Sequence, residues 1–152
     1  MNQLNERINY LNSHIMVCPE CFHGSCEHNY DLIEIDKSMQ EILQILNDKN
    51  YKTLYHCGGH TNTPFIQIYI MFAGFVNFGY NVGLDVGEGW FYNQKKNILE
   101  VFLNKKQTLR LNEEQRVKFI ESKQNELLNW ANSLSPIEIP QIVKVFSDWE
   151  EF

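Results

Sequence analysis

Two cysteines separated by two residues give the chain its clearest chemical signal. Cys18 and Cys21 enclose Pro19 and Glu20, and the proline favours a tight turn between the two thiols. Two thiolates at this spacing can both face one ion at about 2.3 Å, the Zn–S distance of protein zinc sites. The segment therefore predicts a Zn²⁺ site that Cys18 and Cys21 hold in part.

A closed structural zinc site has four ligands, and the sequence offers two ways to complete this one. The local set adds Cys26 and His28, which share one face of an extended segment because they are two residues apart. The remote set adds Cys57 and His60 instead, on either side of a Gly-Gly turn. We expect the local set and keep the remote set as the alternative. Either set fills the coordination sphere, which favours a stabilising metal over a catalytic one.

With a local zinc site, Cys57 and His60 are free for another role. Backbone N–H groups in the turn between them can hold an anion. His60 can approach the Cys57 thiol across the turn and lower its pKa, whereas His56 is expected on the opposite face of its strand. The segment therefore predicts a ligand-binding turn formed by His56, Gly58 and Gly59. Catalysis by Cys57 and His60 is the alternative.

Alternating and continuous apolar stretches predict the sheet that positions this turn. Strands are expected at residues 32–35, 51–57, 65–72, 78–87, 90–92 and 98–103. The strand at 65–72 is apolar on both faces, which predicts a central position. The strand at 78–87 has one face of glycine, Asn81 and Asp85, so a helix or a ligand can approach its backbone closely. Asp85 is a candidate ligand-binding residue for that reason.

Helical patterns flank this sheet-rich segment. A helix or arm is expected over 1–14, and Asp36 is placed to cap a helix with an apolar stripe ending at Leu46. Asn112 and Gln115 match a capping box that opens a long helix, and Pro136 should end it. The chain is expected to be a single α/β (α+β) domain over 1–152, a two-layer mixed or antiparallel sheet packed by helices. Its parts are a zinc-binding loop at 15–30, a sheet-rich core at 31–110 and C-terminal helices at 112–152.

The charge of the chain disfavours a general nucleic-acid binder without excluding a nucleic acid. Lys and Arg number 13 against 19 Asp and Glu, for a net charge of −6. Residues 95–110 differ from this average: five basic residues and one acidic residue give +4 there and leave −10 elsewhere. We expect a solvated hairpin and loop in this window, with Lys95 and Lys96 as candidates for a phosphate- or partner-facing patch.

Apolar stretches are too short for a membrane span of about 20 residues, and the first residues lack an export signal. We therefore expect a cytoplasmic protein without a membrane partner, whose four cysteines stay reduced. Reduced cysteines direct attention to metal or thiol chemistry rather than to disulfides.

Residues 35–72 add a resemblance to a known group of proteins. A helix ending in Leu46-Asn47 is followed by a Tyr-Lys-Thr-x3-Cys-x-Gly-His segment at 51–60 and by Tyr69-Ile70-x-Phe72. This stretch, about a quarter of the chain, resembles small uncharacterised proteins of AT-rich Gram-positive bacteria and their phages. Asn50 stands where that group has a glycine. The resemblance implies a bacterial or phage accessory protein and carries over no catalytic residue.

The expected function combines these observations. We expect a small zinc-stabilised accessory protein that acts as a binding module or inhibitor for a host protein or a nucleotide-like ligand, with Zn²⁺ as its cofactor. Binding is favoured over catalysis because the predicted metal site is closed. The alternative is a hydrolase that acts on a nucleotide or nucleic acid through Cys57 and His60.

Overall fold

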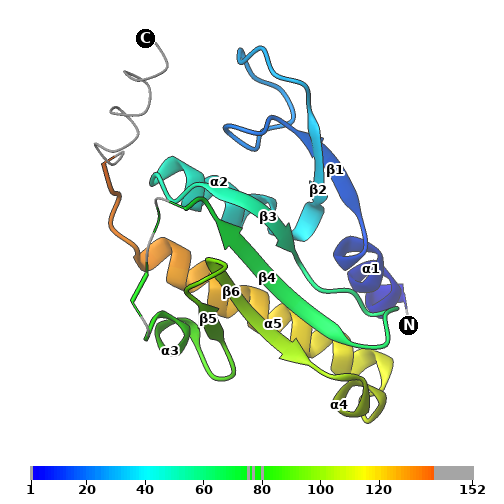
Figure 1. The fold of residues 1–152 in the computed structure, drawn as a ribbon. Helices are drawn as coiled ribbons and strands as arrows, with labels where there is room; N and C mark the ends of the chain where they lie inside the picture. Colours follow the sequence, from blue (N-terminus) through cyan, green and yellow to red (C-terminus); the bar gives the residue numbers. More distant parts are fainter. Residues whose placement is uncertain (1, 75, 77, 80, 139–152) are drawn as a thin grey trace, which may run out of the picture.

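Two antiparallel sheets packed against helices form the structure, a computed structural model that describes residues 2–74, 76, 78–79 and 81–138 (Figure 1). The larger sheet has the strand order β3-β4-β6-β5, and a separate hairpin pairs β1 with β2. The strands are β1 His14–Val17, β2 Ile33–Asp36, β3 Thr53–Cys57, β4 Ile66–Phe72, β5 Phe91–Asn93 and β6 Ile98–Leu103. The expected fold class is confirmed.

Strand β4 lies inside the larger sheet, between β3 and β6. Ile66, Ile68, Ile70 and Phe72 are buried against the helices, and the alternate residues on the other face are partly exposed. The central position expected for this segment is confirmed by these two paired neighbours, and the alternating burial shows that one face of the strand packs on the core.

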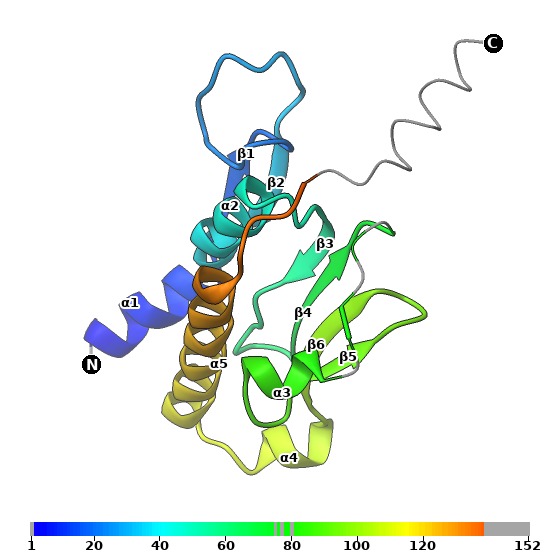
Figure 2. The same cartoon turned by 90° about the vertical axis from the view of Figure 1, so that its left-hand side faces the viewer.

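Helices α2 and α5 cover the same side of this sheet, as Figure 2 shows. The long helix α5 begins at the predicted capping box: the Asn112 side chain accepts the Gln115 N–H at 2.8 Å, and the Gln115 side chain accepts the Asn112 N–H at 2.9 Å. None of the helices in the described part of the chain is long and apolar enough to cross a membrane. The helices are α1 Asn2–Leu11, the 3-10 turn η1 Lys37–Met39, α2 Gln40–Asp48, α3 Val82–Val86, α4 Lys105–Leu109 and α5 Glu113–Ser133.

Helix α3 replaces the strand predicted at 78–87, so that prediction is wrong. Val82 and Val86 are buried, whereas Leu84, which a strand would place beside them, is 77% exposed. Their spacing of four fits one face of a helix as well as one face of a strand, which made the pattern ambiguous. Gly83 contacts the following segment directly, since a Cβ there would lie 2.5 Å from the Trp90 carbonyl oxygen. Gly83 therefore serves helix packing rather than a bare sheet face.

The β1–β2 hairpin projects from the rest of the molecule (Figures 1 and 2). Its register pairs His14 with Asp36 at one end and Val17 with Ile33 at the other. The cysteine loop, residues 18–32, connects the two strands beyond Val17. The second C-terminal helix predicted after Pro136 falls mostly on residues 139–152, which lie outside the described residues.

Candidate metal centres

The cysteine loop brings together the four residues of the local set. One ligand atom from each of Cys18, Cys21, Cys26 and His28 lies within 4.8 Å of the other three. Cys18 Sγ is 3.8 Å from His28 Nδ1. Donors around a tetrahedral zinc ion with Zn–S bonds of about 2.3 Å are separated by about 3.8 Å, so this spacing suits a metal ion. We call these four residues the loop group.

Backbone hydrogen bonds shape the turn that presents Cys18. Phe22 donates its N–H to the Cys18 carbonyl at 2.8 Å, and Cys18 donates its N–H to the His23 carbonyl at 2.8 Å. Phe22 has a φ of 60° and a buried side chain, which anchors the turn in the core. Glu20 donates its N–H to Cys18 Sγ at 3.4 Å. The turn therefore points a donor at the sulfur atom that metal binding would leave negatively charged.

The pKa of Cys18 follows from two opposing effects. Burial raises this pKa, but hydrogen bonds from the backbone of Cys21 and Glu20 and from the thiols of Cys26 and Cys21 lower it more, to about 7. The pKa of Cys26 is instead raised overall, mainly by burial, because the backbone hydrogen bond of His28 lowers it less than burial raises it. A thiolate is the form that binds metal, so the lowered pKa of Cys18 favours its role as a metal ligand.

Cys57 and His60 lie apart from the loop group, so the remote zinc set is not formed. They group with Asp36 instead: one ligand atom from each of the three lies within 4.8 Å of the others. Asp36 ends β2, Cys57 ends β3, and His60 follows the Gly58-Gly59 turn. We call these three residues the Asp36 group.

Asp36 does not act as the helix cap that its position in the sequence indicated. Its side chain makes no capping hydrogen bond to η1. The carboxylate is buried and instead accepts the Gly58 N–H at 2.7 Å. Tertiary contact with the turn therefore replaces the local cap, and it places a carboxylate beside Cys57 and His60.

Three histidines contact Asp36. His14 Nε2 lies 3.0 Å from Asp36 Oδ1, and His60 Nε2 lies 3.9 Å from Oδ2. His56 Nε2 accepts the backbone N–H of Asp36 at 3.2 Å, which assigns the neutral form to this ring. Burial lowers the pKa of His56 in agreement with that assignment, although the Asp36 charge acts in the opposite direction.

A cavity of about 360 Å³ opens beside the Asp36 group at the end of β3. His56, expected on the opposite face of the strand from Cys57, also lines this cavity. Both residues lie at the end of β3, which is an edge strand of the sheet, beside the cavity. The remaining lining residues are Thr63, Phe65, Gln67 and Tyr69.

The environment of Cys57 argues against an activated thiol nucleophile. Burial raises the pKa of Cys57 more than the Gly59 N–H lowers it, and the Asp36 charge adds a smaller increase. A cysteine nucleophile needs the thiolate and therefore a lowered pKa. This arrangement disfavours the hydrolase alternative in which Cys57 attacks a substrate.

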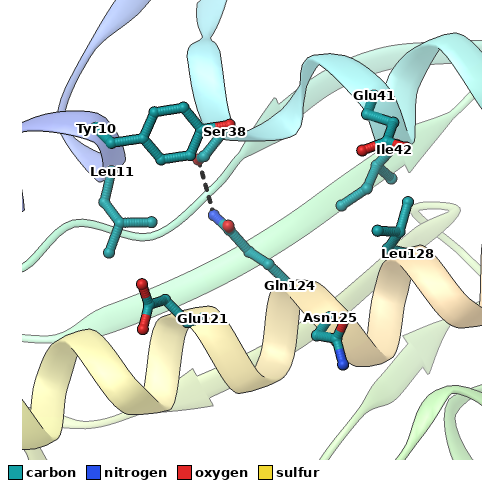
Figure 3. Close-up of a pocket in the computed structure, with 9 residues that line it drawn as sticks. All are labelled: Tyr10, Leu11, Ser38, Glu41, Ile42, Glu121, Gln124, Asn125 and Leu128. Carbon is teal, nitrogen blue, oxygen red and sulfur yellow. Dashed lines mark hydrogen bonds between the residues drawn. The ribbon is translucent and has the colours of Figure 1, made fainter. Parts of the chain in front are cut away.

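Gln124 of α5 positions the glycine turn and was not singled out as functional from the sequence. Its Nε2 donates to the Gly58 carbonyl at 2.8 Å and to Ser38 Oγ at 2.9 Å, the second of which Figure 3 shows. Gln124 is buried, and it is the polar interruption in an otherwise apolar helix stripe. A buried amide needs hydrogen-bond partners. A glutamine within an apolar helix stripe is therefore the sequence signal that could have identified this residue.

Figure 3 also shows the hollow in which this amide lies, about 250 Å³ between α1, η1, α2 and α5. Its described lining contains Glu41 and Glu121 but neither cysteine nor histidine. Glu121 is paired with Arg7. The hollow therefore lacks the donors that distinguish the cavity beside Cys57.

The other sequence-predicted ligand residues lie elsewhere. Asp85 is exposed on α3, and Lys95 and Lys96 are exposed in the turn between β5 and β6. None of these three residues lines the cavity beside Cys57. Of the predicted binding turn, His56 lines the cavity, and Gly58 and Gly59 connect Cys57 to His60.

No protein-family model, curated protein or solved structure matches the chain. The two donor groups are therefore the features from which a function can be inferred.

Proposed function

We propose that the protein is a zinc-stabilised binding module in which one Zn²⁺ ion holds the cysteine loop in shape for a protein partner. The observation that carries this proposal is the approach of all four donors of the loop group to within 4.8 Å. Three thiols and one imidazole suit zinc better than hard cations such as Mg²⁺ or Ca²⁺, which prefer oxygen ligands. Four protein ligands close the coordination sphere, so the ion stabilises the loop and leaves no position for a substrate.

The cysteine loop has almost no hydrophobic core of its own. Residues 23–34 are all exposed, and Phe22 is its one buried apolar anchor besides Cys18. Fixing the backbone of each residue costs about 1–2 kcal/mol in conformational entropy, which an exposed segment cannot recover by burying apolar surface. Metal binding can supply this free energy because the ligands come together only in the folded loop.

Exposed apolar side chains on the hairpin and its loop support a protein partner. Met16, Tyr30, Leu32 and Ile33 are 51%, 58%, 45% and 40% exposed. A projecting element with several large apolar side chains in solvent is more often a protein interaction site than an ordinary solvent-facing surface. The hairpin is therefore a surface that a partner can cover.

The charge of the same segment favours protein over nucleic acid. Residues 8–36 contain no Lys or Arg and five acidic residues: Glu20, Glu27, Asp31, Glu34 and Asp36. Three thiolates around one Zn²⁺ ion would add one further negative charge. An acidic, apolar element repels phosphate and suits a protein surface with a basic rim.

Two histidines of the loop allow a matched test of the metal. His28 belongs to the loop group, whereas His23 is exposed and contacts Gln44. We expect His28→Ala to lose zinc in elemental analysis and His23→Ala to retain it. Equal zinc content in both variants would contradict the proposed ligand set.

The binding role is tested with the exposed apolar residues. Quantitative affinity capture from the source cells should identify a protein that wild type retains and that Tyr30→Ala/Leu32→Ala loses, although this double variant keeps its zinc. The His28→Ala variant should lose the same protein. A captured protein that is unaffected by both changes would show that the cysteine loop is not the binding surface.

A further inference from the structure

The Asp36 group contains three different metal-binding donors that the loop zinc leaves unused. Its carboxylate, thiol and imidazole come from the end of β2, the end of β3 and the turn that follows β3. One ligand atom from each lies within 4.8 Å of the other two. All three donor types bind zinc in proteins, so this approach is what a metal site requires.

We propose that Asp36, Cys57 and His60 form a second metal site, for a divalent ion of the zinc type, with one coordination position open to the adjacent cavity. Three protein ligands and one exchangeable ligand are the arrangement of zinc sites that bind small molecules or water. The second site therefore differs in kind from the closed site of the cysteine loop.

A buried charge without a permanent counter-ion supports this assignment. Asp36 is 6% exposed, and its ion-pair partners among the described residues are His14 and His60, with no Lys or Arg. A buried carboxylate is costly unless a positive charge compensates it. A divalent cation between Asp36, Cys57 and His60 would supply that charge.

The backbone around the group is held in place before any ion binds. Gly58 donates its N–H to Asp36 Oδ2 at 2.7 Å, and the Gly58 carbonyl accepts from Gln124 at 2.8 Å. His14 Nε2, 3.0 Å from Asp36 Oδ1, holds the other carboxylate oxygen. Contacts of this kind orient metal ligands, and their loss typically lowers metal affinity by about 10–100-fold. His14 is therefore a positioning residue of the second site.

The cavity indicates what the open position would take. It is about 360 Å³ in volume, and beyond the Asp36 group its lining is neutral, with the polar side chains of Thr63, Gln67 and Tyr69. The Thr63 hydroxyl already donates to the Phe65 carbonyl, and one N–H of Gln67 donates to Glu100. The Tyr69 hydroxyl and the second N–H of Gln67 can donate hydrogen bonds to a ligand on the metal. Because the site offers a cation and neutral donors, the ligand class is water or a small oxyanion, such as a carboxylate or phosphate group.

The test uses the full-length protein, freed of metal and then titrated with Co²⁺, a coloured substitute for Zn²⁺. Wild type should bind two ions per chain by elemental analysis, one to each group. His60→Ala and Cys57→Ser should each bind one ion, and Cys26→Ser should keep the ion of the Asp36 group. His23→Ala is the matched control and should bind as wild type. Circular dichroism verifies that each variant is folded, and His60, at the partly exposed turn, gives the variant least disruptive to folding.

The open position has its own readout. Adding inorganic phosphate or acetate should shift the visible Co²⁺ spectrum of Cys21→Ser/Cys26→Ser, which keeps only two donors of the loop group, and should leave that of His60→Ala unchanged. His14→Ala should weaken binding at the second site about 10–100-fold. One ion per chain in wild type, with His60→Ala and Cys57→Ser unchanged, would overturn the second site. Loss of ions in Cys26→Ser alone would then still support the loop site, so the two proposals fail separately.

Discussion

The carboxylate of Asp36 accepts the backbone N–H of Gly58 at 2.7 Å, and this bond joins the β1–β2 hairpin to the turn after β3. Asp36 pairs with His14 at the base of the hairpin, while the loop group lies beyond its other end. One hairpin therefore carries a donor group at each end. Ordering of the cysteine loop and placement of the Asp36 carboxylate are parts of the same structural element.

This connection predicts that the two metal sites are coupled. Cys21→Ser should weaken Co²⁺ binding at the Asp36 group, because an unordered loop leaves β1 and β2 less firmly paired. Coupling free energies between sites are typically 1–3 kcal/mol, or about 5–150-fold in affinity. Linkage is reciprocal, so Cys57→Ser should weaken the loop site by the same factor. Titrations of both variants that match wild type at the remaining site would show that the sites are independent.

Gln124→Leu should destabilise the protein and disturb the glycine turn. The change leaves the buried Gly58 carbonyl without the donor that holds it at 2.8 Å, which costs about 1–3 kcal/mol. The measurement is the free energy of unfolding from urea titration. Asn125→Ala is the control, since Asn125 is exposed on the same helix, and it should stay within about 0.5 kcal/mol of wild type. A Gln124→Leu variant as stable as the control would contradict the positioning role.

Gly59→Ala should be destabilising for two reasons. Gly59 has a φ of +91°, and a Cβ there would lie 2.9 Å from Ile68 Cγ1. Strained backbone of this kind costs about 1–3 kcal/mol. Gly74→Ala is the matched control, since a Cβ at Gly74 meets nothing within 4 Å. Thermal unfolding of the two variants should separate them clearly, and equal melting temperatures would rule out the strained turn.

Tyr51 predicts a pH dependence of stability. Its hydroxyl donates to the Ser135 carbonyl at 2.6 Å, and burial raises its pKa above 10. The protonated form is thus favoured in the folded state, so its contribution is complete below the unfolded pKa of about 10 and is lost as pH rises through the folded pKa. Tyr51→Phe should lower stability by about 0.5–1.5 kcal/mol at neutral pH. This deficit should shrink in urea titrations above pH 10, and a constant deficit would contradict the raised pKa.

Local patterns explain which features the sequence could predict. The loop group was predictable because its four ligands lie within eleven consecutive residues, Cys18 to His28. The capping box of α5 and the central position of β4 also follow from spacings of a few residues. Such features depend on short stretches of chain, whose geometry the residue types largely determine.

Tertiary contacts explain what the sequence could not show. Asp36 matched a helix cap, and only the packing of β2 against the turn after β3 places it beside Cys57. Val82 and Val86 fit one face of a strand as well as one face of a helix, and the glycine between them, Gly83, packs against the segment at Trp90 in the helix. Gln124 interrupted an apolar stripe, but its partners come from residues that are distant in the sequence.

The most direct test of the central claim is X-ray absorption spectroscopy at the zinc edge. The purified Cys57→Ser variant is the best sample, because the loop group is then the one complete donor set that we propose. We predict one zinc ion per chain, coordinated by three sulfur atoms at about 2.3 Å and one nitrogen atom. A protein without bound zinc, or zinc coordinated by nitrogen and oxygen alone, would contradict the account.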